Sequence, residues 1–159
     1  MKRSFVRLVW TLCILGLFAT ACARDIYQQR ADIIKDRSKS LYSLLRDDRV
    51  AGAVAENEQI EGLALEMERG LLRRAMAMDA NAKAREWLLI KTANHAAAEN
   101  WLSIGRYLAE TNRVDQAKAV YQRVVETYEP KGGEYAPTVE RARRAIKDAA
   151  ILTPQGSSR

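Results

Sequence analysis

The stretch that decides the fold is residues 101–121, which read WLSIGRYLAETNRVDQAKAVY. Apolar or small side chains recur there at steps of three and four residues, which predicts the buried face of an amphipathic helix. A polar segment, residues 111–115, interrupts this spacing before it resumes. We therefore expect two antiparallel helices joined by a short turn. Their inward-facing residues would be Trp101, Ile104, Gly105 and Leu108 on the first helix, and Ala117, Tyr121 and Val124 on the second.

The spacing of these residues resembles the tetratricopeptide repeat (TPR), a helical hairpin with the pattern W-x2-L-G-x2-Y followed by A-x3-F. Trp101, Gly105, Ala117 and Tyr121 fall in register with that pattern, and the resemblance covers residues 98–131. It implies that Gly105 and Ala117 lie where the two helices pack closest, because larger side chains would force the helices apart. Trp101 and Tyr121 would fill the ends of the hairpin.

One repeat cannot bury its own faces, so neighbouring repeats are required. A step of about 34 residues back from Trp101 reaches Met67, with Trp87 at the second aromatic position, and a step forward reaches Tyr135. We therefore expect an all-α solenoid of TPR-like antiparallel hairpins, with about five to seven helices. Its further parts would be a divergent repeat over residues 64–97 and a capping helix over residues 136–152.

The rest of the chain is also helical in pattern, because no proline occurs between residues 24 and 129 and strong helix formers dominate. No stretch alternates in the way that predicts a strand. We expect a helix over 25–46 with Ile26, Ile33 and Ile34 on its apolar side, and further helices over 58–80 and 82–97. Asp47 and Asp48 are predicted to cap the helix that follows them, and residues 79–81 to form a capped turn; the fold of residues 46–60 stays open.

The first 21 residues have the parts of a secretory signal peptide in order: a basic start, an apolar run and small residues. The apolar run is too short for a comfortable membrane span, which needs roughly 20 residues. The sequence Ala19-Thr20-Ala21-Cys22 resembles the lipobox of bacterial lipoproteins. This resemblance implies that Cys22 is diacylated, becomes the new N-terminus and holds the protein on a membrane. An uncleaved signal anchor and plain secretion are the alternatives.

Cleavage before Cys22 would leave 138 of the 159 residues and would lower the net charge from +6 to +3, because Lys2, Arg3 and Arg7 depart. Cys22 would then be the sole cysteine, so no intrachain disulfide could form. The modest charge and the export signal argue against a nucleic-acid partner. Ala23 follows the cysteine, where an Asp would resemble an inner-membrane retention signal. We expect the outer membrane, facing the periplasm, with the inner membrane as the alternative.

The sequence divides into four segments. Residues 1–21 form the signal peptide, 22–60 the lipidated N-terminus with a helical segment, 61–152 the TPR-like domain, and 153–159 a disordered tail. The segment 124–137 also resembles the links between repeats in periplasmic TPR proteins of the barrel-assembly and Tol–Pal coordinator type. That resemblance agrees with export.

The residues that could carry chemistry are few. His95 and Glu99 share one helix face, but zinc needs three or four protein ligands. No Ser-His-Asp set, phosphate-binding glycine loop or separated acidic pair occurs, so we expect no enzyme, cofactor, metal or small-molecule substrate. Arg73-Arg74 is interpreted as a solvated face. The basic cluster over residues 141–147 is interpreted as a solvated face or as a contact for anionic lipid or an acidic partner.

The TPR resemblance also implies a binding groove, lined by the first helix of each pair on the side opposite its packed face. In residues 98–111 that side carries Glu99, Leu102, Arg106 and Ala109, with an exposed leucine among mixed charges. Such a surface suits a peptide or a partner helix. We therefore expect a membrane-anchored adaptor that binds another envelope protein. The alternative is an obligate structural subunit of an envelope assembly, secretion or pilus complex.

Overall fold

The computed structural model describes residues 26–152, with side chains up to residue 148, and this part of the chain is all-α, as predicted. Cys22, the signal peptide and the tail 153–159 lie outside the described residues. Two short 3-10 turns, η1 (Glu129–Lys131) and η2 (Gly133–Tyr135), connect the last two of the five α-helices described. These are α2 (Ile26–Arg46), α3 (Val50–Arg74), α4 (Ala80–Glu110), α5 (Val114–Tyr128) and α6 (Ala136–Leu152).

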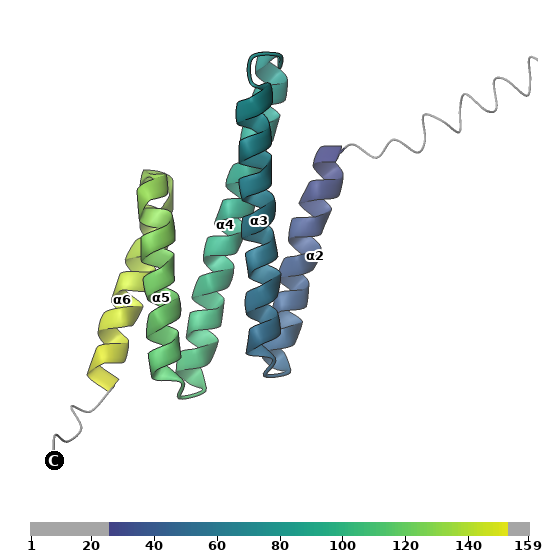
Figure 1. Ribbon diagram of the computed structural model, residues 1–159. Coiled ribbons are helices and arrows are strands. Elements are labelled where there is room, and N and C mark those ends of the chain that lie inside the picture. Colours follow the sequence, from purple (N-terminus) through teal and green to yellow (C-terminus); the bar gives the residue numbers. More distant parts are fainter. Residues whose placement is uncertain (1–25, 153–159) are drawn as a thin grey trace, which may run out of the picture.

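The helices run alternately up and down and form two layers. In Figure 1, α3 and α5 lie in front, and α2, α4 and α6 lie behind them. Each helix packs against the next one along the chain, and α4 also contacts both α2 and α6 within its own layer. Helix α4 is therefore the centre of the fold, and its two sides are covered by different neighbours. None of the described helices is long and apolar enough to cross a membrane.

The α2–α3 packing shows which residues of the predicted first helix face the core. Ile34 is buried as expected, but Ile26 and Ile33 are exposed, so their predicted place on the apolar side is wrong. Helix α3 begins at Val50, within the segment 46–60 whose fold the sequence left open, and ends at Arg74. A side chain at Gly52 would be tightly packed, because a Cβ atom there would lie 3.2 Å from Leu44 Cδ2. The glycine that weakens the helical pattern in the sequence thus lets α2 and α3 approach each other closely.

Helix α4 differs most from the sequence-based prediction. It is one helix of 31 residues, Ala80–Glu110, whereas two separate helices were predicted over 82–97 and 98–111. No proline, glycine or capping residue separates the two predicted parts, and Ala97 and Ala98 at the junction are completely buried. The divergent repeat over residues 64–97 is therefore wrong, because the chain does not turn at its end.

The two predicted caps have different outcomes. Asp79 caps α4, since its side chain accepts a hydrogen bond of 2.8 Å from the backbone N–H of Ala82. The cap predicted at Asp47 and Asp48 is wrong, because α3 is preceded by Arg49 and has no side-chain cap. Asp48 instead has a positive φ of 56° and ends α2.

The turn at Asp48 has a close counterpart at Asn112, where φ is 61°. In each turn the next residue donates a 2.8 Å hydrogen bond five residues back, from Arg49 N to Leu44 O and from Arg113 N to Leu108 O. This is the Schellman end of a helix, with Asp or Asn in the left-handed position. The α2–α3 and α4–α5 hairpins thus share one turn geometry at a spacing of 64 residues.

Candidate partner-binding surface

The four residues predicted to line a groove do not form one open surface on α4. Leu102 retains only 6% of its accessible surface, so the prediction of an exposed leucine is wrong. Helix α6 contacts α4, and Thr138 of α6 bonds to Glu99, three residues before Leu102, so α6 covers this part of α4. Ala109 is half-buried against the core, and Arg106 is exposed.

Glu99 is held by α6. Its Oε1 accepts a 2.9 Å hydrogen bond from Thr138 Oγ1, and the same oxygen pairs with Arg141. The basic cluster of α6 is ion-paired in the same way elsewhere, since Arg143 pairs with Glu129 and Arg144 with Glu140. The structure therefore brings together Glu99 and the basic cluster, which the sequence treated as separate features. Each carboxylate reduces the charge that this cluster presents to a lipid or an acidic partner.

Arg106 lies on a surface that continues onto α2. It makes no ion pair with any described residue. The neighbouring Ser103 donates a hydrogen bond of 3.0 Å to the backbone oxygen of Glu99, and its Oγ lies 3.3 Å from the hydroxyl of Tyr42. We call Tyr42, Glu99, Ser103 and Arg106 the α2–α4 face. Sequence reasoning missed Tyr42, because helical spacing does not show which helices lie side by side.

A second exposed surface lies beyond the end of α5. Trp87 has 45% of its surface exposed, so it is not the packed second aromatic of a repeat as predicted. It lines a pocket of about 160 Å³ with Glu68 and Lys91, next to the η1–η2 segment. Leu65, three residues before Glu68 on α3, is also exposed. We call Leu65, Glu68, Trp87 and Lys91 the Trp87 surface.

The lining of this pocket includes an ion pair and a buried tyrosine. Lys91 Nζ lies 2.8 Å from Glu134 Oε2, and this hydrogen bond lowers the pKa of Glu134. Burial, followed by the nearby charge of Glu134, raises the pKa of Tyr135 to about 12. His95 stacks on Tyr135, with ring centroids 4.6 Å apart. His95 therefore packs against an aromatic ring rather than standing free in a cleft.

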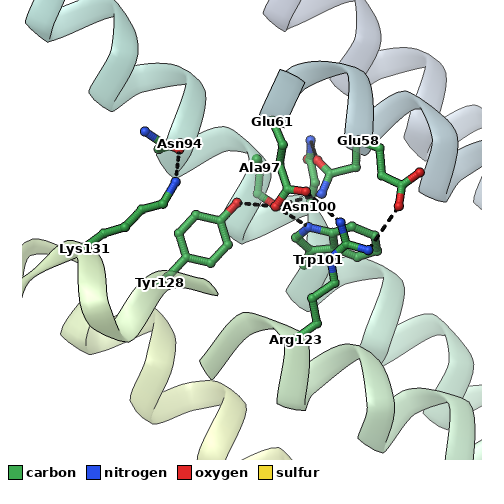
Figure 2. Close-up of polar contacts among 10 residues, drawn as sticks. Glu58, Glu61, Asn94, Ala97, Asn100, Trp101, Arg123, Tyr128 and Lys131 are labelled. Carbon is green, nitrogen blue, oxygen red and sulfur yellow. Dashed lines mark hydrogen bonds and ion pairs between the residues drawn. The ribbon is translucent and has the colours of Figure 1, made fainter. Parts of the chain in front are cut away.

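Glu61 on α3 joins three helices, as Figure 2 shows. Its Oε1 accepts hydrogen bonds of 2.8 Å from Trp101 Nε1 and from the hydroxyl of Tyr128. Its Oε2 accepts a 2.9 Å bond from Arg123, whose guanidinium lies 4.1 Å from the Trp101 ring centroid. Arg123 also reaches Glu58, at 3.0 Å. This cluster fixes the position of α5 against α3 and α4.

A buried pair of asparagines, Asn57 and Asn100, fixes α2, α3 and α4 against one another. Asn57 donates a 3.0 Å hydrogen bond to the backbone oxygen of Ala97, and its own oxygen accepts from Asn100 at 3.0 Å. Asn100 also donates to Ser38 Oγ at 3.2 Å. Within the described residues, every buried side-chain nitrogen or oxygen has a hydrogen-bond partner. These interior hydrogen bonds fix the positions of the helices relative to one another. If one helix slid along its axis, a buried amide would lose its hydrogen-bond partner.

The part of the chain that the structure describes contains no group of three His, Cys, Asp or Glu residues that could hold a metal ion. The comparisons with known proteins add no assignment. No family model matches the chain, and neither the curated proteins nor the solved structures include a significant match.

Proposed function

We propose that the protein is a membrane-anchored adaptor of the bacterial cell envelope, with a short TPR-like helical array that binds another envelope protein. The observation that carries this proposal is the packing of the α4–α5 hairpin. Gly105 lies against the ring of Tyr121, and Trp101 and Ala117 are completely buried. These are the contacts that the repeat resemblance implies. The matching turn of the α2–α3 hairpin supports a repeated unit.

We place the partner on the α2–α4 face. Tyr and Arg are among the residues that contribute most to protein interfaces, and Tyr42 and Arg106 are both exposed there. Arg106 has no carboxylate partner among the described residues. An acidic side chain of a partner peptide or helix could therefore form an ion pair with its guanidinium. A lipid anchor would raise the local concentration of such a partner, so a small contact area can suffice.

The alternative, an obligate subunit of a larger envelope complex, is favoured by the Trp87 surface. Trp87 on α4 and Leu65 on the adjacent helix α3 are large apolar side chains that are exposed to solvent. Such exposure is typical of surfaces that another subunit covers in an assembly. A subunit of this kind would be stable only with its neighbour, whereas an adaptor would fold alone and bind reversibly.

The test is co-purification of the full-length lipidated chain from its native membrane. We expect Tyr42→Ala with Arg106→Glu to abolish partner recovery, and Trp87→Ala, a matched loss of one large exposed side chain, to leave it unchanged. The adaptor assignment fails if the double variant keeps its partner. Loss of the partner with Trp87→Ala alone would favour the obligate subunit. Circular dichroism and thermal melting of each variant show that the fold is retained.

A further inference from the structure

The α3–α4 hairpin ends in a tip that projects from the rest of the fold. In Figure 1 the upper end of this hairpin extends beyond α2 and α5. We define the hairpin tip as residues 69–85. Two of its apolar side chains face solvent, since Leu72 is 69% exposed and Met76 is fully exposed. These side chains contribute nothing to the core, so the fold alone does not explain them.

The hairpin tip is also strongly basic. It carries five cationic residues and a single acidic one, Asp79. The turns at the other end of the helices differ, because residues 46–49 are balanced and residues 110–115 carry two acidic residues against one arginine. Charge is thus distributed unequally along the long axis of α3 and α4. The cations of the tip are Arg69, Arg73, Arg74, Lys83 and Arg85.

The start of α2 is fixed beside this tip. The guanidinium of Arg85 lies 5.6 Å from the ring centroid of Tyr27, and Arg30 Nη1 lies 3.1 Å from Glu86 Oε1. Arg74 binds the same oxygen of Glu86 at 2.9 Å, so the buried carboxylate ties the end of α3 to both α4 and α2. The start of α2 therefore lies at the same end of the molecule as the hairpin tip (Figure 1).

Chain length then limits where the tip can lie. Only four residue steps separate Cys22 from Ile26, the first residue of α2, and four steps span at most about 14 Å. A diacylated Cys22 would sit at the membrane surface. The beginning of α2, and the hairpin tip beside it, would then lie within reach of the lipid headgroups. This step rests on the lipid anchor of the proposed function.

We propose that the hairpin tip contacts the headgroup region of an anionic phospholipid leaflet. Leu72 and Met76 enter the interface, and Arg69, Arg73 and Lys83 pair with lipid phosphates. Exposed apolar side chains surrounded by cations are the composition that binds such a surface. The tip is a second attachment beside the acyl chains, and it orients α3 and α4 away from the membrane.

The test uses the mature lipidated protein in vesicles of phosphatidylethanolamine and phosphatidylglycerol. An environment-sensitive fluorophore is attached to a Met76→Cys variant, whose new thiol is the one free thiol when Cys22 is in thioether linkage. Asp47→Cys, in the turn at the opposite end of α3, is the matched control. We expect a blue shift and several-fold stronger quenching by a lipid-borne nitroxide at position 76 only. Arg69→Gln with Arg73→Gln and Lys83→Gln should reduce that quenching.

The intact mass of the same sample separates the possible failures. Equal quenching at positions 76 and 47 in protein that carries the acyl mass overturns the lipid contact and leaves the anchor standing. Absence of the acyl mass overturns the anchor and this inference with it. A label at position 76 that is shielded from aqueous iodide but not quenched by the lipid nitroxide would mean that a second copy of the protein covers the tip, which also overturns the lipid contact.

Discussion

Gly105 of α4 and the ring of Tyr121 on α5 are closer than any other residue at position 105 would permit. A Cβ atom on Gly105 would lie 2.5 Å from Tyr121 Cε1 and 2.8 Å from its Cζ. Real side chains do not approach this closely, so the absence of a side chain allows the two helices to meet. The prediction that Gly105 is a close helix–helix contact is confirmed.

Gly105→Ala is therefore expected to destabilise the protein, although alanine favours a helix by about 1 kcal/mol over glycine. The methyl group must displace the Tyr121 ring, and overpacking of this kind costs about 1–3 kcal/mol. Gly105→Leu should cost more. The matched control is Gly62→Ala in α3, where no atom lies within 4 Å of the new Cβ and where stability should rise. Urea unfolding measures both, and a more stable Gly105→Ala variant would contradict the packing described.

Asp48, in the α2–α3 turn, binds Arg113 in the α4–α5 turn. This contact should make the stability of the fold depend on pH. Asp48 Oδ1 accepts hydrogen bonds from Arg113 and from the hydroxyl of Tyr107, at 3.1 Å for the latter, and these bonds lower the pKa of Asp48. A lowered pKa stabilises the fold above the pKa of the unfolded chain, and this contribution is lost as the pH falls through the folded value.

Asp48→Asn is the sharpest test of that contribution, because asparagine also accepts the left-handed conformation, as Asn112 does. We expect the variant to unfold at a lower urea concentration than the wild type at pH 7. The two should converge as the pH falls through the lowered pKa of Asp48, where the carboxylate of the wild type becomes protonated. A difference that stays constant across this range would show that the carboxylate charge does not contribute.

The parts of the fold that the sequence predicted are those whose contacts lie within one hairpin. Gly105, Ala117 and Tyr121 are close in sequence, so their spacing alone indicates the packing of α4 on α5. The turn of the α2–α3 hairpin also has a sequence pattern, Leu44-x3-Asp48-Arg49-Val50. It matches the pattern at the α4–α5 turn, Leu108-x3-Asn112-Arg113-Val114. A search at a spacing of 34 residues misses this pattern, because α3 has 25 residues and α4 has 31, which places the two turns 64 residues apart.

The candidate site was harder to predict for a physical reason. Helical spacing correctly places Glu99, Leu102 and Arg106 on one side of α4, but it does not reveal what lies opposite. The burial of Leu102 depends on how the η1–η2 segment returns the chain to α6. For the same reason Leu102→Asp cannot test binding, since it would bury a carboxylate and destabilise the fold.

Glu61→Gln is expected to destabilise the protein by about 1–3 kcal/mol, which is typical of a lost hydrogen bond to a partly buried charged group. Two donors, from Trp101 and Tyr128, share one oxygen of Glu61, and Arg123 takes the other. A glutamine would direct an amide N–H group at one of these donors, and that donor would then have no acceptor.

Glu58→Gln is the matched control for Glu61→Gln. It changes the other carboxylate that Arg123 contacts, in a half-exposed ion pair of 3.0 Å. Exposed pairs contribute about 0–1 kcal/mol, so this variant should melt close to the wild type. Thermal melting followed by tryptophan fluorescence distinguishes the two. Equal melting temperatures for both variants would show that the Glu61 cluster does not hold α5 in place.

Lipidation of Cys22 has a direct test in the cysteine itself. Cys22→Ser keeps the size of the side chain but removes the sulfur that a diacylglyceryl group needs. We expect the variant to keep its signal peptide and to lack the acyl mass that mass spectrometry detects in the wild type. A wild-type protein whose mass equals that of the unmodified chain would contradict lipidation.

The residue after the cysteine should decide which membrane holds the protein. Ala23 lacks the carboxylate that resembles an inner-membrane retention signal, so the wild type should sediment with the outer membrane on a density gradient. Ala23→Asp should move the protein to the inner-membrane fraction, with its acyl mass unchanged. Both proteins share every residue of the helical domain, so a shift between fractions would follow from this one side chain. Recovery of the wild type solely in the inner membrane would contradict the outer-membrane prediction, while the acyl mass would still test the anchor independently.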